Sequence, residues 1–234
     1  MPNFKPKGIG LCLLALFLAA LPTATAEDDA PEEAPRRRSL LSLDFDTTDL
    51  PMSRRWSFKV GAARITPKSI AKIMQGDIKF SGGDEGGWLY IASASYLIGE
   101  FQLGVGDMVF RPKLEAPLTL EVFDEHARRP FLSYNAALMV RWVDFPWNNY
   151  VRTTAGLGWG LSYSEKIPAM ERRKRPEQHR SHLKFTLPVE VTFAHPRWPQ
   201  HQLAVFIAHQ SGGFGFFDHG GLNSVGLGYR LSFW

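Results

Sequence analysis

Two side chains near the end of the chain have the types and the spacing of a nucleophile and its base. His209 and Ser211 lie two residues apart, in line with the alternating apolar residues Leu203, Val205 and Ile207. On a β-strand, such residues project from one face with Cα atoms roughly 6.6 Å apart, so the imidazole can reach the hydroxyl. A serine whose proton is taken by a neighbouring base can attack an ester. The spacing alone is weak evidence, because most such pairs at a strand end are polar rim residues.

The residues that follow Ser211 are rich in glycine and can supply the donors that an ester hydrolase needs. Segment 212–221 reads GGFGFFDHGG. Backbone N–H groups stabilise the oxyanion of a tetrahedral intermediate when they point at the reacting carbonyl. We expect the backbone N–H groups of Gly212 and Gly213 to form this oxyanion site.

The elements that would position these residues are long alternating strands. Apolar side chains recur at every second position in segments 132–142, 151–163 and 183–193, with polar residues between them. A repeated period of two predicts strands, and their length matches the nine to eleven or so residues that cross a bilayer at a tilt. The same alternation predicts further strands at 56–65, 88–98, 118–122, 203–211 and 225–233.

These segments predict an all-β fold: an eight-stranded antiparallel transmembrane β-barrel of the outer-membrane type over residues 56–234. Segment 99–117 is ambiguous and is interpreted as a long turn or an extra hairpin arm. Pro188 interrupts the sixth strand, and we expect a local bulge there because a closed barrel has no free edge.

A barrel of this size has little room inside beyond its own side chains. Four charged residues face inward by the phase of their strands, namely Arg141, Arg152, Lys184 and Glu190. Interior charges need partners. The pattern therefore predicts a buried ionic network rather than a channel.

The first residues have the pattern of a secretory signal peptide. Lys5 and Lys7 precede an apolar run over 9–21, and a small-residue cleavage pattern ends at Ala26. We expect residues 1–26 to be removed, and with them the single cysteine, Cys12. Residues 27–55 lack a pattern that forms ordered structure, which predicts a flexible N-terminal periplasmic segment.

An even number of strands places both termini on the same side, which is the periplasm in barrels of this kind. The last strand then ends in the periplasm, so the strand over 203–211 runs outward. His209 and Ser211 are therefore predicted at the extracellular rim, in the outer membrane of a Gram-negative bacterium. A modest excess of Lys and Arg gives a formal net charge of +4.

At these residues a resemblance to a known family is found. The segment HQSGGFGFFDHGGLNSVGLGYR resembles the C-terminal region of the lipid A 3-O-deacylase (acyloxyacyl hydrolase) family. The resemblance implies an eight-stranded outer-membrane barrel that removes an ester-linked acyl chain from lipid A, with Ser211 as nucleophile and His209 as base. It implies no metal and no other cofactor.

The chain departs from the family at two positions. Gly212 stands where the family has an Asn that serves the oxyanion site, and Asn223 stands where it has a Glu that orients the His. An Asn can orient a His by hydrogen bonding but offers no carboxylate charge to an imidazolium. Asp218, in the loop, is the alternative group to orient His209.

The predicted function is that of an outer-membrane lipid esterase, a lipid A deacylase. The external loop at 165–180 is rich in Lys and Arg, which bind phosphates by charge-assisted hydrogen bonds, so we expect contact with lipopolysaccharide. The alternatives are a non-enzymatic barrel that binds lipopolysaccharide or has a structural role, and an esterase with another lipid substrate. No nucleic-acid partner is expected, and the sequence leaves the acyl position and the oligomeric state open.

Overall fold

The computed structural model describes residues 41–105, 108–126, 128–174, 180–213, 215–218 and 220–234. The predicted signal peptide lies outside the described residues, as does the start of the predicted N-terminal segment. The described strands are β1 Leu41–Thr47, β2 Trp56–Thr66, β3 Gly87–Val105, β4 Met108–Phe110, β5 Lys113–Glu125, β6 Phe131–Trp142, β7 Arg152–Ser164, β8 Leu183–Thr186, β9 Val189–Ala194, β10 His201–Ser211 and β11 Gly221–Ser232. The short helices are η1 Met52–Arg54, α2 Ile70–Met74, η2 Gly83–Glu85 and α3 Ala169–Lys174.

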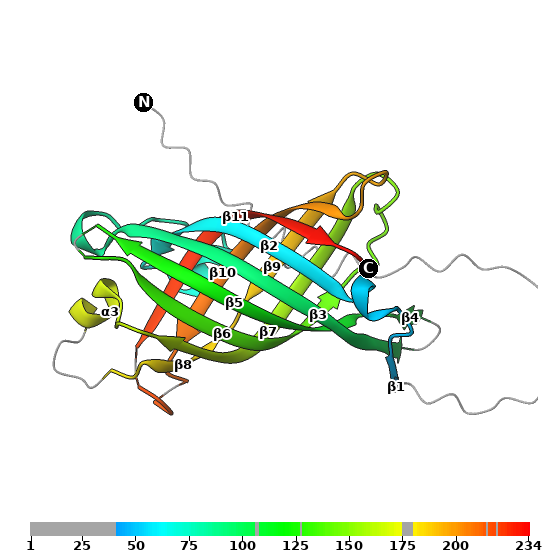
Figure 1. Ribbon diagram of the computed structural model, residues 1–234, viewed down its shortest axis with the longest axis horizontal. Helices are drawn as coiled ribbons and strands as arrows, with labels where there is room; N and C mark the ends of the chain where they lie inside the picture. Colours follow the sequence, from blue (N-terminus) through cyan, green and yellow to red (C-terminus); the bar gives the residue numbers. More distant parts are fainter. Residues whose placement is uncertain (1–40, 106–107, 127, 175–179, 214, 219) are drawn as a thin grey trace, which may run out of the picture.

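The described strands close into an antiparallel barrel. Strand β2 pairs with β3 on one side and with β11 on the other, and the ring continues through β5, β6, β7, the pair β8 and β9, and β10. Because β8 and β9 follow one another in a single strand position of the ring, the barrel is eight-stranded. The predicted fold class is confirmed. Figure 1 shows the tilted strands, with α3 at one end and the C-terminus at the other.

The alternation predicted for the strands matches the two faces of the wall. Apolar side chains such as Leu138, Trp159 and Leu227 are exposed on the outside, whereas the polar residues between them are buried inside. No helix among the described residues is long and apolar enough to cross a membrane.

The predicted ionic network lies in the barrel interior. Arg141 pairs with Glu115 and Glu190, and Arg230 pairs with the same two carboxylates. Each of these side chains is almost fully buried, so the lumen is crossed by paired charges that fill it. Lys184 is also buried and paired, with Glu171 and Asp218. Arg152 departs from the prediction, because it is the first residue of β7 and is exposed.

Leu187 and Pro188 separate β8 from β9, which together form one strand of the barrel. No extra residue is inserted between them relative to the neighbouring strand. Thr186 pairs with Gly160 and Val189 pairs with Leu157, so the register continues across the break. The predicted bulge is therefore wrong. Gly158 lies opposite Pro188, where a side chain would meet the proline ring at 2.8 Å, and its N–H donates to the Pro188 carbonyl at 2.8 Å. Because Gly158 has no side chain, the proline fits in the strand without a change of register.

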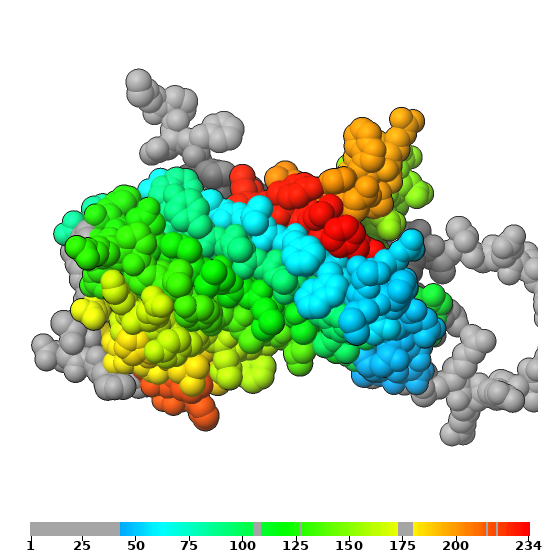
Figure 2. All heavy atoms as spheres, viewed as in Figure 1, coloured from blue at the N-terminus to red at the C-terminus, as the bar shows by residue number. Residues whose placement is uncertain are grey.

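The prediction of a flexible segment over 27–55 fails for part of its length. Residues 41–47 form β1, which pairs along residues 99–105 of β3. The ambiguous segment 99–117 is a hairpin arm. Strand β3 extends beyond the barrel there and pairs with β4 and with the start of β5. Figure 2 shows the first described residues, in blue, packed at this end of the barrel. The backbone of the arm supplies hydrogen-bond partners that composition does not reveal.

Candidate active site

The predicted dyad lies at the end of β10, on the outer face of the barrel. His209 and Ser211 are half-buried, and they continue the exposed stripe that contains Leu203 and Val205. The neighbouring strand β11 places Asn223 directly opposite His209 in the register. The hairpin of β10 and β11 thus brings the third candidate residue to the first two, although fourteen positions separate Asn223 from His209.

Asn223 holds the imidazole of His209 in a defined orientation. Asn223 Oδ1 lies 2.6 Å from His209 Nδ1, and Asn223 Nδ2 donates to the Lys68 carbonyl at 2.7 Å. Because the carbonyl can only accept, the amide NH₂ must face Lys68 and the amide oxygen must face the imidazole. The neutral ring then carries its proton on Nδ1, and Nε2 is left as the basic nitrogen. This is the tautomer that a general base requires.

Asp218, the other candidate for orienting His209, lies elsewhere. Its carboxylate accepts hydrogen bonds from Lys184 Nζ at 2.8 Å, from the Ser181 N–H at 2.9 Å and from the Gly220 N–H at 2.6 Å. Burial alone would raise the pKa of Asp218, but these donors outweigh it and lower the pKa below its ordinary value. Of the two candidates, the structure therefore brings Asn223 and not Asp218 to the imidazole.

The two glycines expected to form the oxyanion site are closely packed in the loop. The Gly212 N–H donates to the Gly220 carbonyl at 3.0 Å. A side chain at Gly212 would meet Asp218 at 2.0 Å, and one at Gly213 would meet the ring of Phe185 at 2.3 Å. Close packing explains both glycines, and neither lines the pocket that holds Ser211.

That pocket has a volume of about 340 Å³ and opens at the rim of the barrel. Three parts of the chain meet there: the turn after β2, the α3 loop and the β10–β11 hairpin. The lining residues are Pro67, Lys68, Ser69, Glu171, Arg180, His209, Ser211, Gly220, Gly221 and Asn223. Within the described residues, the hydrogen bond that the His209 ring forms is the one to Asn223.

Sequence reasoning missed three contributors to the pocket. Arg180 belongs to the basic loop that was singled out for phosphate contact, but nothing in the pattern placed it beside Ser211. Glu171 is buried on α3, where burial raises its pKa despite the hydrogen bond from Lys184. The Lys68 carbonyl had no signal at all, because every residue has a carbonyl and only the fold decides which one meets Asn223.

An aromatic cluster lies on the other side of Ser211. Phe185 of β8 pairs with Ser211 in the register, and its ring lies 4.8 Å from that of Phe217, 5.7 Å from that of Phe216 and 5.4 Å from that of Trp159. Phe216 is 76% exposed. Ser211 therefore stands between a polar pocket and an apolar surface.

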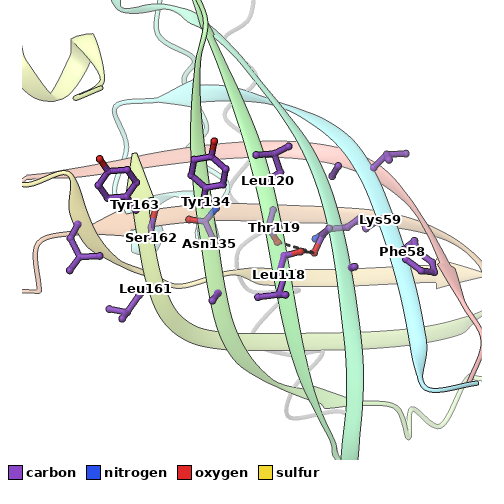
Figure 3. Close-up of a pocket in the computed structure, with 16 residues that line it drawn as sticks. Phe58, Lys59, Leu118, Thr119, Leu120, Tyr134, Asn135, Leu161, Ser162 and Tyr163 are labelled. Atoms are coloured by element: carbon purple, nitrogen blue, oxygen red, sulfur yellow. Dashed lines mark hydrogen bonds between the residues drawn. The ribbon is translucent and has the colours of Figure 1, made fainter. Parts of the chain in front are cut away.

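A larger apolar groove of about 690 Å³ lies on the outer wall, away from the dyad. Small residues of β3 and β6 are among its lining residues, as are Leu118, Leu120, Tyr134, Leu161 and Tyr163 (Figure 3). Neither His209, Ser211 nor Asn223 lines it. We therefore assign it to the apolar exterior and not to the candidate active site.

Fold and site together define a closed antiparallel barrel with a Ser, a His and an Asn in one rim pocket. No protein-family description matches the chain, and no curated protein matches its sequence. Among solved structures, the chain is similar to the crystal structure of the outer membrane enzyme PagL. The identity is 12% and the TM-score 0.51, over 75% of this chain and 99% of that chain. A likeness at this identity establishes the fold alone.

Proposed function

We propose that the chain is an outer-membrane lipid esterase in which Ser211 is the nucleophile, His209 the base and Asn223 the group that orients the base. The main support is the pair of hydrogen bonds that fixes Asn223 between His209 and the Lys68 carbonyl. A polar chain of this kind on an otherwise apolar outer wall gains nothing from contact with lipid tails. It does provide the tautomer and ring orientation that proton transfer needs.

The reaction follows from the atoms in the pocket. Ser211 Oγ attacks the carbonyl carbon of an acyl ester while its proton passes to Nε2 of His209. The bond to the alcohol oxygen breaks, and the imidazolium returns the proton to that oxygen. Water, deprotonated by the same nitrogen, then hydrolyses the acylated Ser211 and releases the fatty acid. The Asn223 amide keeps the Nδ1–H in place throughout but adds no charge to stabilise the imidazolium.

Lipid A is the substrate that the surroundings of the dyad favour. Arg180 lines the pocket that holds the dyad, where phosphates of the headgroup would lie. Arg172, on α3, adds an exposed positive charge. The aromatic cluster around Phe185 offers an apolar surface for an acyl chain. The sequence resemblance of the β10–β11 region to lipid A 3-O-deacylases supports the same substrate. The rim pocket then faces outside the cell, and residues 1–26 are the cleaved signal peptide.

The second candidate is a non-enzymatic barrel that binds lipopolysaccharide or has a structural role. The Gly212 N–H is already bonded to the Gly220 carbonyl, and this observation favours the second candidate. An esterase needs donors for the oxyanion, and a loop that uses its amides internally has to rearrange to supply them.

Release of free fatty acid from purified lipid A in detergent micelles tests the proposal. Ser211→Ala and His209→Ala should each abolish release, because a nucleophile and its base act as a unit. Ser53→Ala and His195→Ala are matched controls, since both residues are exposed and lie outside the pocket. A folded wild type that releases no fatty acid from lipid A or phospholipids above the Ser211→Ala background would leave the binding or structural barrel as the function.

A further inference from the structure

Arg64 is a charged residue on the outer wall of the barrel, close to the candidate active site. Its neighbours on β2, Ala63 and Ile65, are buried, whereas Val60 and Phe58 on its own face are exposed. An arginine on the face that meets lipid is costly unless its charge is compensated, so its surroundings call for an explanation.

Two aromatic rings hold the guanidinium. Its central carbon lies 5.2 Å from the ring centre of Phe80 and 5.6 Å from that of Trp88, within the range of cation–π attraction. Trp88 is the register partner of Arg64 on β3. Phe80 is held against β2 because Thr66 Oγ1 donates to the Lys79 carbonyl at 2.6 Å and the Ser81 N–H donates to the Ile65 carbonyl at 2.9 Å. The fold therefore builds the aromatic pair around the arginine.

The guanidinium has aromatic faces for neighbours but no anion. Within the described part of the chain, no ion pair or hydrogen bond engages the Arg64 side chain, and its Nε is buried without an acceptor. The interior arginines Arg141 and Arg230 each pair with two carboxylates. Rings that stack on a guanidinium leave the N–H groups at its edge available, and that edge matches the oxygens of a phosphate.

The register places Arg64 near the dyad. His209 pairs with Asn223, and Asn223 pairs with Thr66. Two strand spacings of about 4.8 Å and two residues along β2 put the Cα of Arg64 roughly 12 Å from that of His209. The two sites therefore face the same side of the barrel, at a separation that one glycolipid headgroup can bridge with the help of the long arginine side chain.

We propose that Arg64, held by Phe80 and Trp88, is a phosphate-binding subsite for the phosphorylated headgroup of the lipid substrate. The inference rests on the proposed function, since it anchors the lipid whose ester Ser211 attacks. The rings orient the guanidinium, and a headgroup phosphate supplies the missing anion. Lys68 is a less suitable cation for the phosphate than Arg64, because its Nζ is already paired with Asp77 at 2.6 Å.

Equilibrium binding of lipid to the full chain in detergent micelles, followed by native mass spectrometry, tests the subsite. All proteins carry Ser211→Ala, so that no lipid is consumed. Wild-type Arg64 should bind bisphosphorylated lipid A more tightly than the same lipid with its phosphates removed. Arg64→Gln should weaken binding of the phosphorylated lipid about tenfold, as expected for one charge-assisted contact, and leave the dephosphorylated lipid unchanged. Arg197→Gln, an exposed arginine in the β9–β10 turn, is the charge-matched control and should change neither.

Phe80→Leu removes one ring from a half-exposed loop position and serves if Arg64→Gln does not fold. It should weaken binding of the phosphorylated lipid alone, by about threefold, because part of the cation–π contact is lost. Inorganic phosphate is added as a competitor in a further arm and should displace the lipid only at concentrations far above those of the lipid.

Equal binding of the two lipids by the wild type, or an equal loss for both in the Arg64 and Phe80 variants, would show that Arg64 only anchors the barrel at the membrane interface. Displacement by inorganic phosphate at the lipid's own concentration would show a site for a free ion. Either result overturns the proposal. Because the assay measures no hydrolysis, it separates this outcome from failure of the esterase: a lipid-binding, inactive barrel would keep the subsite and lose the proposed function.

Discussion

Replacing Asn223 with Leu isolates the contribution of the hydrogen-bonded chain behind the base. Leu keeps the same branched arrangement of heavy atoms but removes both the 2.6 Å contact with His209 and the 2.7 Å hydrogen bond to the Lys68 carbonyl. The imidazole is then free to rotate or to adopt the other tautomer, in which Nε2 carries the proton and cannot take one from Ser211. We expect the folded variant to bind lipid but to turn it over slowly.

The size of the loss follows from the bond that is removed. The partner of Asn223 becomes charged when His209 accepts the proton, and hydrogen bonds to charged groups contribute about 1.5–3 kcal/mol. That range corresponds to a fall in kcat of roughly 10- to 150-fold. It is smaller than the loss expected for a buried carboxylate at the same place, because an amide stabilises an imidazolium only through its dipole.

Fatty acid release from lipid A under saturating substrate gives kcat directly. Val225→Leu is the matched control, since Val225 is the next residue on the same face of β11 and lies opposite Ile207 rather than His209. Heat-modifiable gel mobility checks that each variant folds. A folded Asn223→Leu barrel with kcat within twofold of the wild type would refute the assignment of Asn223 as the orienting residue.

Three further predictions use other parts of the molecule. Leu227→Arg puts a charge on the exposed outer wall in the middle of β11 and should destabilise the barrel by about 2–4 kcal/mol, measured by urea unfolding in lipid vesicles. A loss below 0.5 kcal/mol would mean that this face does not meet lipid. Because the pKa of Asp218 is lowered, its stabilising contact with Lys184 should be fully present above the ordinary value of 3.8 and disappear as the pH falls through the lowered value. Asp218→Asn should remove that acid-dependent component from thermal unfolding, and an unchanged pH profile would contradict the assignment. A cysteine introduced at Arg172 should react with an impermeant thiol reagent on intact cells, whereas one at Arg197 should not, and the reverse pattern would invert the proposed orientation.

The architecture of the barrel could be predicted from the sequence because it depends on a local pattern. Side chains alternate with a period of two on any strand, so one polar and one apolar face per segment can be found without knowing the neighbours. The strands β6 and β7 were predicted nearly to their ends for this reason. Strand β1 was missed although Leu41, Leu43 and Phe45 alternate with polar residues, because this alternation is short and follows a charged stretch. Its order comes from pairing with the extended β3.

In the candidate site, too, some residues follow from the pattern of a single strand and others only from the tertiary structure. His209 and Ser211 are two apart on one strand, so their common face follows from the sequence alone. The choice between Asn223 and Asp218 depended on the register of two strands and on the path of the loop between them, which no local pattern specifies. The Lys68 carbonyl, Arg180 and Arg64 came to the rim from distant parts of the chain. Barrel closure brings Lys68 and Arg64 to the hairpin that carries the dyad, because it joins β2 to β11, the first and last strands of the ring.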